Sequence, residues 1–327
     1  VYKRQVYDFA QDVTLVPETE RFGMFGSWDH SLTDSVGFFT RVMYSTSESS
    51  RDLASAPNAY PVAPTNPNNY FGEPVLAIYR LNDLGPRRDE FKTDAYNWVA
   101  GFNGTVSGWM WEFAGGMSNV DTSIDGVLGY GLATDIQGAI DAGTLNVFGD
   151  SPNLDAESLL YRTERDGETD MTHFDFQVTG SLFEMTHGPV GAAFGVEYRD
   201  QEFSDQFDDA TASGAVVGVG GVSAEGDRDV WAVYAELVFP LLDSVELQVA
   251  GRYDDYSDFG GTFNPKVGLH WQATEALALH ATASTGFKAP ALHELYSGDI
   301  FAFDSVFDTT NCNAAQAAND PAGIASY

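Results

Sequence analysis

The chain has 327 residues, of which 43% are hydrophobic, 20% charged and 13% aromatic, so its composition is not that of a disordered protein. Its formal net charge of -32 would repel nucleic-acid phosphates, which argues against a nucleic-acid partner. The acidity indicates either a solvated acidic surface or a vestibule that attracts cations. The single cysteine, Cys312, predicts neither an internal disulfide nor a zinc or redox site, although it leaves open a partner in a longer chain.

The first residues show no basic segment followed by an apolar one, as a signal peptide would have. Residues 1–5, VYKRQ, fit no structural element and resemble a sequencing-adapter or cloning scar. We therefore place the folded region at 6–327. No run of 18 apolar residues is present, so no transmembrane helix is predicted.

Apolar and polar residues alternate with a period of two along much of the chain, which predicts about ten β-strands. In the clearest case, 245–254, Val245, Leu247 and Val249 lie on one face, whereas Glu246 and Arg252 lie on the other. The predicted strands lie near 20–30, 36–48, 90–105, 109–121, 174–183, 190–199, 230–239, 245–254, 263–271 and 277–287.

The connections between these strands alternate in length. Short turns are predicted near 31–35, 106–108, 185–189, 241–244 and 273–275. Longer segments lie at 49–87, 122–168 and 207–228, followed by a tight turn at 258–261 and by everything after 288. Outer-membrane barrels have short periplasmic turns and long extracellular loops, whereas a β-sandwich has no reason to gather its long loops at one end. The sequence therefore predicts an all-β fold, a partial antiparallel transmembrane β-barrel.

Aromatic residues lie at the ends of several predicted strands. They fit either the aromatic girdle of a membrane barrel or ordinary cross-strand packing. They are Trp109, Trp111, Phe183, Phe239 and Trp271.

Three loop segments carry local signals. Residues 57–69 are rich in Pro and Asn and are predicted to be irregular and exposed. Residues 132–143 predict a short helix with Ile136 and Ile140 on one side and Gly143 as its end. The run 214–222 is similar to a phosphate-binding loop, but it lacks the flanking strand and helix, which predicts a flexible loop instead.

Two segments, GRYDDYSDFGGTFNP at 251–265 and STGFKAPALHEL at 284–295, together with 229–241, resemble the barrel of TonB-dependent outer-membrane receptors. The resemblance spans roughly 6–310 and is specific from about 176 to 295. The matching motif residues are Arg252, Tyr253, Asp254, Ser257, Asp258, Phe259, Gly260, Asn264, Pro265, Lys266, Gly286, Phe287, Lys288, Ala289 and Pro290.

The resemblance implies a barrel of about 22 strands with an N-terminal plug inside it. On this expectation the chain holds about ten strands and lacks the plug, the energy-coupling box and the later strands. Its end strands would have unpaired edges and its lipid face would expose apolar surface, so we expect no stable folding of this piece alone in water.

The motif residues have a structural interpretation that requires no chemistry. Phe259, Gly260 and Gly261 predict a tight hairpin, with a glycine free to adopt positive φ. Asp254, Asp255 and Asp258 are expected to crowd that turn at the outer rim. Pro265 is expected near a strand start, where a missing backbone donor costs least.

No catalytic or metal-binding residue is predicted. His293 and Glu294 begin like a metalloprotease helix, but the position four after His293 is Ser297. The pairs Asp254–Asp255 and Asp208–Asp209 match no EF-hand spacing and indicate solvated acidic loops. Five mid-strand charges are expected to face the lumen, where they would pair across strands, dock the plug or simply be hydrated. They are Glu197, Arg199, Glu236, Arg252 and Lys266.

The resemblance implies active uptake of a scarce ligand, such as a siderophore, cobalamin or saccharide, in the outer membrane of a Gram-negative bacterium. The partners would be the TonB complex, the ligand and outer-membrane lipid, with no cofactor. Ligand contacts are expected from the segments 49–87, 122–168, 207–228 and 296–327. A passive porin or specific channel is the alternative, followed by a secreted β-sandwich hydrolase or binding module.

Overall fold

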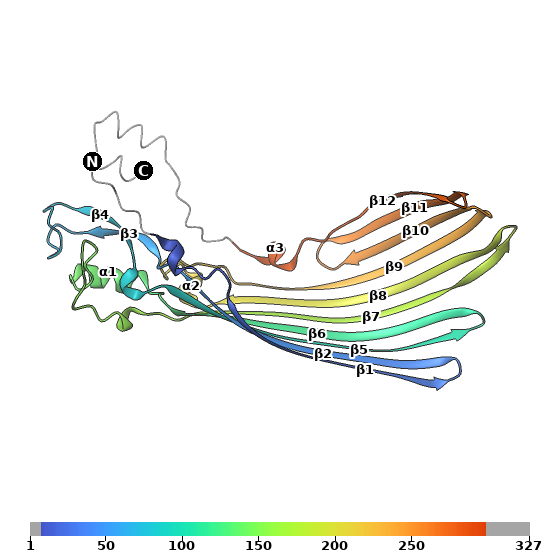
Figure 1. Ribbon diagram of the computed structural model, residues 1–327, viewed down its shortest axis with the longest axis horizontal. Helices are drawn as coiled ribbons and strands as arrows, with labels where there is room; N and C mark the ends of the chain where they lie inside the picture. The colour runs from blue at the N-terminus through green and yellow to red at the C-terminus, as the bar shows by residue number, and fades with distance from the viewer. Residues whose placement is uncertain (1–7, 299–327) are drawn as a thin grey trace, which may run out of the picture.

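The computed structural model describes residues 8–298 and contains one large antiparallel sheet of ten strands (Figure 1). The strands follow one another in the sheet in chain order, each hydrogen bonded to the next. They are β1 (Glu18–Thr33), β2 (Val36–Leu53), β5 (Arg87–Val106), β6 (Trp109–Leu128), β7 (Thr163–Met185), β8 (Gly188–Phe207), β9 (Ala224–Leu242), β10 (Val245–Tyr256), β11 (Gly260–Thr274) and β12 (Leu277–Ser284).

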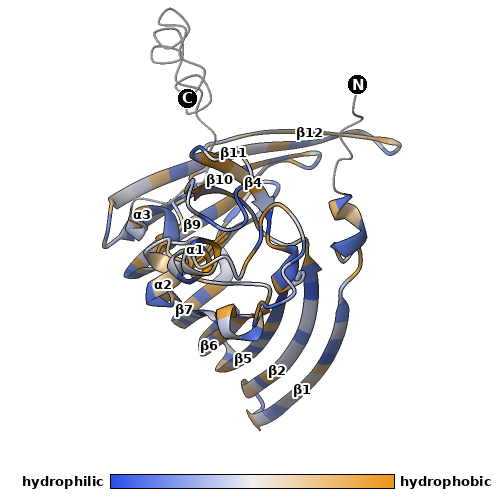
Figure 2. Ribbon diagram, turned by 90° about the vertical axis from the view of Figure 1, so that its left-hand side faces the viewer, coloured by the Kyte–Doolittle hydropathy of each residue, from blue (hydrophilic) through white to orange (hydrophobic). Residues whose placement is uncertain are grey.

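The sheet is curved and open, and β1 and β12 are its two edge strands in the part of the chain that the structure describes (Figure 2). A second, two-stranded sheet consists of β3 (Pro57–Val62) and β4 (Val75–Arg80). The helices are η1 (Phe9–Asp12), η2 (Asn82–Leu84), α1 (Ala133–Asp141), η3 (Glu157–Leu159), α2 (Asp209–Ala212) and α3 (Leu292–Tyr296). None of the helices between residues 8 and 298 is long and apolar enough to cross a membrane.

The predicted alternation of short and long connections is confirmed. Five hairpins of the large sheet have two-residue turns, and all five lie at the same end of the sheet (Figure 1). In the β5–β6 turn, Ser107 and Gly108 have φ angles of 49° and 83°, as a type I′ turn requires. The long connections, 54–86, 129–162 and 208–223, all lie at the opposite end, where β10 and β11 are joined by the short turn 257–259.

The strands extend further than the sequence predicted, mainly at the end with the long connections. β7 has 23 residues, about 75 Å of chain at the usual rise, whereas a membrane-spanning barrel strand needs only about 9–11 residues. The wall of strands therefore continues well beyond the thickness of a bilayer. The ends of the strands beyond the bilayer therefore hold the long connections at a distance from the apolar part of the sheet.

The two faces of the sheet differ in polarity. We define the apolar face by a row of residues that lie opposite one another on consecutive strands and whose side chains are all at least about a third exposed. The row is Phe102, Phe113, Phe176, Val196, Val233, Tyr253 and Phe263. Directly opposed residues of an antiparallel sheet point to the same side, so the alternate positions form a second face, which we call the polar face.

The aromatic residues predicted at strand ends lie near the two-residue turns. Phe183 and Trp271 are about half exposed, as a girdle residue would be. Trp109 instead stacks on Phe194 with ring centroids 6.4 Å apart, and its ring covers Gly180, where a Cβ would lie 2.5 Å from it. Both the girdle and the cross-strand packing interpretations therefore have examples here.

The exposed apolar face leads to a first test. Val267 of β11 lies on this face, opposite Val249 and Ala283, and is 48% exposed. We expect Val267→Arg to lower the free energy of unfolding in a lipid bilayer by about 2–4 kcal/mol, the cost of a cation at mid-membrane depth. The measurement is denaturant unfolding of the complete protein in lipid vesicles. Ala250→Arg, on the polar face beside Glu236, is the matched control, and an equal loss in both variants would contradict the assignment of the faces.

Candidate functional site

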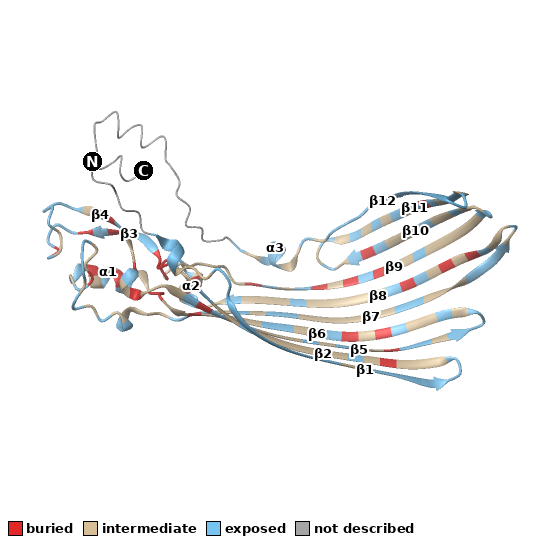
Figure 3. Cartoon of the chain, in the orientation of Figure 1, coloured by how far each residue is buried: buried red, intermediate tan, exposed pale blue. Residues whose placement is uncertain are grey.

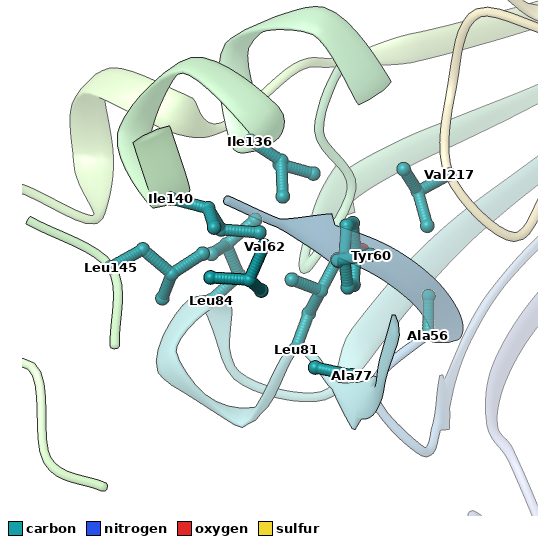
Figure 4. Close-up of a cluster of buried hydrophobic side chains, with 10 residues drawn as sticks. All are labelled: Ala56, Tyr60, Val62, Ala77, Leu81, Leu84, Ile136, Ile140, Leu145 and Val217. Atoms are coloured by element: carbon teal, nitrogen blue, oxygen red, sulfur yellow. The ribbon is translucent and has the colours of Figure 1, made fainter. Parts of the chain in front are cut away.

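The three long connections pack together into one compact layer at the end of the sheet, which we call the cap. Its core combines residues from β3, β4, α1 and the three connections (Figure 4). Buried residues are concentrated here, whereas the large sheet has only scattered ones (Figure 3). The core residues are Ala56, Tyr60, Val62, Ala77, Leu81, Leu84, Ile136, Ile140, Leu145 and Val217.

The predicted helix in 132–143 is confirmed as α1. Ile136 and Ile140 are 0% and 1% exposed and face the cap core, and Gly143 follows with a φ of 74°, which favours glycine at a helix end. The carbonyl of Ile140 accepts a hydrogen bond from Asn66 Nδ2 at 2.6 Å. This bond ties the first long connection to the second.

The prediction that 57–69 is irregular and exposed is wrong for its first part. Pro57–Val62 forms β3, with Tyr60 and Val62 buried at 3% and 2%. The two prolines of this segment are tolerated because β3 pairs with β4 alone, so its other edge needs no backbone donor. The burial of alternate side chains against α1 outweighs the turn-forming composition.

The run 214–222 is a loop, as predicted, but it is bound to the cap on several sides. Val216 and Val217 are 0% and 4% exposed, and the backbone of 215–217 exchanges hydrogen bonds with residues 131–133. Gly218 has a φ of 77°, and its carbonyl accepts a hydrogen bond from Arg87 at 2.8 Å. The third connection is therefore fastened both to the second connection and to the start of β5.

Asp208 closes the end of β8 rather than standing in a solvated acidic pair. Its carboxylate accepts hydrogen bonds from the backbone N–H of Thr211 at 2.9 Å and of Glu164 at 3.0 Å, and from the hydroxyl of Tyr161 at 2.8 Å. Burial raises the pKa of Asp208, but these bonds outweigh it and hold the pKa below the usual value. The solvated interpretation is therefore wrong for this residue, which caps α2.

Burial also raises the pKa of Tyr60, from 10.0 to about 12. The closed cap keeps this phenol neutral, whereas an opened cap lets it ionise at its ordinary pKa. Cap stability is therefore complete below about pH 10 and falls as the pH rises towards about 12. Tyr60→Phe is expected to remove part of this loss of cap stability at alkaline pH. Hydrogen exchange of the α1 amides between about pH 10 and about pH 12 would measure the difference. Tyr70→Phe, at a position that is 81% exposed, should leave the loss unchanged.

All five charges predicted to face the lumen lie on the polar face. The strand register places Glu197 and Arg199 of β8, Glu236 of β9, Arg252 of β10 and Lys266 of β11 at alternate positions to the apolar row. That they line a lumen or contact a plug stays a prediction.

Arg252 connects three of these strands. Its guanidinium makes a bidentate pair with Glu197 at 2.9 and 2.6 Å and contacts Asp254 at 2.9 Å. β8 and β10 are not neighbours, so the pair crosses over β9, where Tyr234 lies against the guanidinium. Tyr234 can lie flat here because residue 195 is glycine, where a Cβ would come within 2.2 Å of the ring.

The other predicted charges have weaker local contacts. Glu236 accepts a hydrogen bond from Gln248 at 2.6 Å. Arg199 lies opposite His173 in the register, and a buried nitrogen of each, Nε of Arg199 and Nδ1 of His173, has no hydrogen-bond partner among the described residues. His173 was not identified from the sequence.

A unit of one arginine, one carboxylate and one aromatic ring recurs on the polar face and at its rim. Each guanidinium forms an ion pair with the carboxylate and lies about 5–6 Å from a ring centroid, where cation–π attraction is favourable. The units are Arg51, Asp89 and Phe91; Arg165, Asp205 and Phe207; Arg228, Asp258 and Phe259; and Arg252, Glu197 and Tyr234.

The family-motif residues converge on Arg228, which sequence reasoning missed. The guanidinium of Arg228 donates to Asp258 at 2.7 Å and to the carbonyl of Pro290 at 3.0 Å. The side chains of Arg228 and Asp258 are only 5% and 8% exposed, so Asp258 lies at the predicted turn but as a member of a buried ion pair. The motif therefore joins the β10–β11 turn to the segment that follows β12.

Aromatic residues surround this ion pair. Phe259 stacks on Tyr256 at 4.4 Å and contacts Phe287 at 5.1 Å between ring centroids. Arg228 lies over both Tyr256 and Phe259. We call Arg228, Tyr256, Asp258, Phe259, Phe287 and Pro290 the motif cluster.

The turn itself differs slightly from the prediction. Its central residues are 257–259, and Gly260 and Gly261 begin β11 instead of forming the turn. Gly260 has the positive φ that was expected, 94°, and a Cβ at Gly261 would lie 2.2 Å from the hydroxyl of Tyr253. Ser257 Oγ accepts a hydrogen bond from the backbone of Asp229 at 3.0 Å, which holds the turn against β9.

Other motif positions have structural roles or open surroundings. Asp254 is buried by its contact with Arg252, so it too is not a solvated rim residue. Pro265 is not near a strand start, because β11 begins at Gly260. Its carbonyl accepts a hydrogen bond from the backbone N–H of Thr285, next to the last residue pair between β11 and β12. Asn264 lies opposite Arg252, whereas Gly286 and Lys288 are exposed.

The candidate chemical groups form no reaction centre. His293 and Glu294 lie in α3, where the Glu294 carboxylate accepts from the backbone of Ala291 at 3.0 Å. Within residues 8–298, no group of three or more His, Cys, Asp or Glu side chains is placed to hold a metal ion. Cys312, residues 1–5 and most of 296–327 lie outside the described residues.

Comparison with known proteins gives a consistent result. A family model described as the TonB dependent receptor-like β-barrel matches residues 22–322. The iron-regulated outer membrane virulence protein of Vibrio cholerae is 25% identical over 125 residues, 37% of this chain and 18% of that protein.

Two solved receptors of Pseudomonas aeruginosa share the fold. A mutant of the ferric enterobactin receptor PfeA has a TM-score of 0.51 and 15% identity, and the match covers 89% of this chain and 36% of that chain. FpvA, solved with bound pyoverdines, has a TM-score of 0.50 and 14% identity, with coverages of 81% and 35%. The chain thus spans about a third of the length of these structures.

Proposed function

Because the chain belongs to the TonB-dependent receptor family and lies in the outer membrane of a Gram-negative bacterium, we propose that it serves the active uptake of a scarce ligand. The observation that carries this proposal is the match of the family's barrel model to residues 22–322. The ligand would enter from the side of the cap, and energy would come from the inner-membrane TonB complex.

We further propose that residues 6–327 are one part of a larger barrel. Within residues 8–298 the sheet has ten strands, and its edge strands β1 and β12 have no further partner strand there, whereas closure of a barrel removes every edge. The remaining strands would complete the wall, and a plug would lie against the polar face. Arg199 and His173, whose buried nitrogens have no partner among the described residues, are suitable positions for a carbonyl or carboxylate of that plug.

Among the ligands considered, a ferric siderophore is the leading candidate. The Vibrio relative is named as iron-regulated, and the two Pseudomonas structures are named as a ferric enterobactin receptor and a pyoverdine complex. No catalytic group is assigned, so the proposed activity is transport without chemical change of the ligand.

Uptake by intact cells of the source bacterium provides the test. Cells grown in low iron would be given siderophore mixtures loaded with radioactive iron, with and without the receptor gene and with and without TonB. We expect the share of uptake that depends on the receptor to be absent in cells without TonB, and deletion of the receptor gene to cause no further loss there, because the two act in one path. Uptake that needs the receptor but not TonB would instead favour a passive channel and overturn the proposal.

A further inference from the structure

The outermost part of the cap exposes aromatic side chains. Tyr70 and Phe71, in the loop between β3 and β4, are 81% and 65% exposed, and Phe148, in the second long connection, is 36% exposed. Phe71 and Phe148 meet edge to face with ring centroids 5.8 Å apart. We call these three residues the tip patch.

Hydrogen bonds between the two connections hold the tip patch in place. Asn68 Nδ2 donates to the carbonyl of Gly143 at 3.0 Å, beside the bond from Asn66 to Ile140. Asn69 fixes Phe71 by accepting from its backbone N–H at 2.9 Å, and Asn146 does the same for Phe148 at 3.0 Å. Rings that are exposed yet held by an ordered backbone are suited to binding, because little conformational entropy is lost on contact.

An exposed carboxylate follows each of the two contacting rings closely in the chain. Glu73 and Asp150 are exposed and stand two residues after Phe71 and Phe148 in the chain. The rest of the cap surface adds five exposed acids, Asp135, Asp141, Asp155, Glu157 and Asp209. The basic residues of the three connections are Arg80 and Arg162; Arg80 donates to the carbonyl of Ser55, and Arg162 pairs with Asp125 at 2.9 Å.

The four recurring units in the wall offer no unpaired positive charge to compensate for these acids. The arginines of the four recurring units, Arg51, Arg165, Arg228 and Arg252, are each paired with a carboxylate. An anionic ligand approaching the cap would therefore meet repulsion that no free guanidinium of these units offsets. A cation would gain both the field of the carboxylates and the π faces of the rings.

We propose that the tip patch recognises a positively charged group with apolar surface on the transported ligand. The inference rests on the proposed function only for its statement that the ligand is transported. The apolar character of the contact is inferred from the tip patch, and its charge from the neighbouring acids Glu73 and Asp150. It assigns to Phe71 and Phe148 the apolar contact, and to Glu73 and Asp150 the selection of charge.

Tetraphenylphosphonium and tetraphenylborate test this choice, because the two ions match in size and apolar surface and differ in the sign of charge. Equilibrium dialysis would measure their binding to the complete receptor in phosphatidylcholine nanodiscs, against empty nanodiscs. We expect the receptor to bind the phosphonium above the lipid background and the borate no more than the background. The binding should weaken as salt is raised, since exposed charges are screened.

Two double variants locate the contact. Phe71→Ser with Phe148→Ser, and Glu73→Gln with Asp150→Asn, are each expected to weaken phosphonium binding by about threefold or more, the scale of an exposed cation–π contact or ion pair. The control, Leu32→Ser with Asp34→Asn, alters an exposed apolar residue and an acid at the opposite end of the sheet and should bind like the unaltered receptor.

Equal binding by the receptor and the tip-patch variants, or a preference for the borate, would overturn the inference. Its failure is distinguishable from that of the proposed function, because dialysis needs neither TonB nor uptake. Phosphonium binding that depends on the tip patch in a receptor whose uptake is independent of TonB would support the inference and reject only the energised mechanism.

Discussion

Arg228→Ala is expected to release the segment after β12 from the barrel wall. The substitution leaves the Asp258 carboxylate buried without its partner and removes the donor to Pro290. Removing one member of a buried ion pair costs about 3–5 kcal/mol, and here the cost falls on the motif cluster. Trypsin digestion of intact cells is the measurement, because Lys288 is exposed within the released segment. We expect cleavage after Lys288 to accelerate strongly in the variant.

Two further variants distinguish the effect of losing this buried ion pair from the effect of losing any ion pair of an arginine. Arg88→Ala removes a partner of Asp52, but that pair is 46% and 30% exposed and is expected to contribute no more than about 1 kcal/mol. Arg228→Lys keeps the charge while losing the planar fork, so its cleavage rate should lie between those of the unaltered receptor and Arg228→Ala. Equal cleavage in Arg88→Ala and Arg228→Ala would show that the motif cluster does not hold the segment.

Leu81→Ala is expected to open the cap while leaving the barrel strands folded. Leu81 is 0% exposed at the centre of the cap core, and truncation of a buried leucine costs about 2–5 kcal/mol through lost burial and the cavity that remains. The cap has a core separate from the sheet, so its opening need not disturb the strand ladder. Hydrogen exchange should become faster in α1 and β3 and stay unchanged in β9 and β10.

The control for this test is an exposed leucine of β4, the strand that ends just before Leu81. Leu76 of β4 is 57% exposed, and Leu76→Ala is expected to change cap stability by less than about 0.5 kcal/mol. If Leu81→Ala accelerated exchange in β9 and β10 as much as in α1, the cap and the sheet would form one cooperative unit, contrary to this prediction.

The number and order of the sheet strands were predictable from the sequence, because period-two alternation persists wherever one face is apolar. The strand ends near the long connections were not. The start of β7, Thr163–Asp170, is polar on both faces, so no alternation marks it as a strand. For the same reason the sequence placed Arg228 in a loop, whereas it lies within β9.

The candidate site was predictable only in part. The motif residues were identified, but their common partner was not, because Arg228 is 30 residues from Asp258 and 62 from Pro290 in the chain. The sequence did not predict β3, which contributes to the cap core. This strand contains two prolines, which are typical of loops, and only two buried residues, Tyr60 and Val62, so its alternation is too short to recognise. Contacts between distant loops leave no local periodicity, so only the three-dimensional structure reveals the tip patch.

The pair between Arg252 and Glu197 also has a mechanical consequence. Backbone hydrogen bonds resist the sliding and separation of adjacent strands but leave a thin sheet compliant to bending about the axis of a strand. A side-chain link from β8 to β10 that passes over Tyr234 on β9 resists that bending, because bending would change the distance between the two paired side chains. When force is applied to the polar face, this three-strand section should deform less than the sheet beside it, and the load would pass to the neighbouring hairpins.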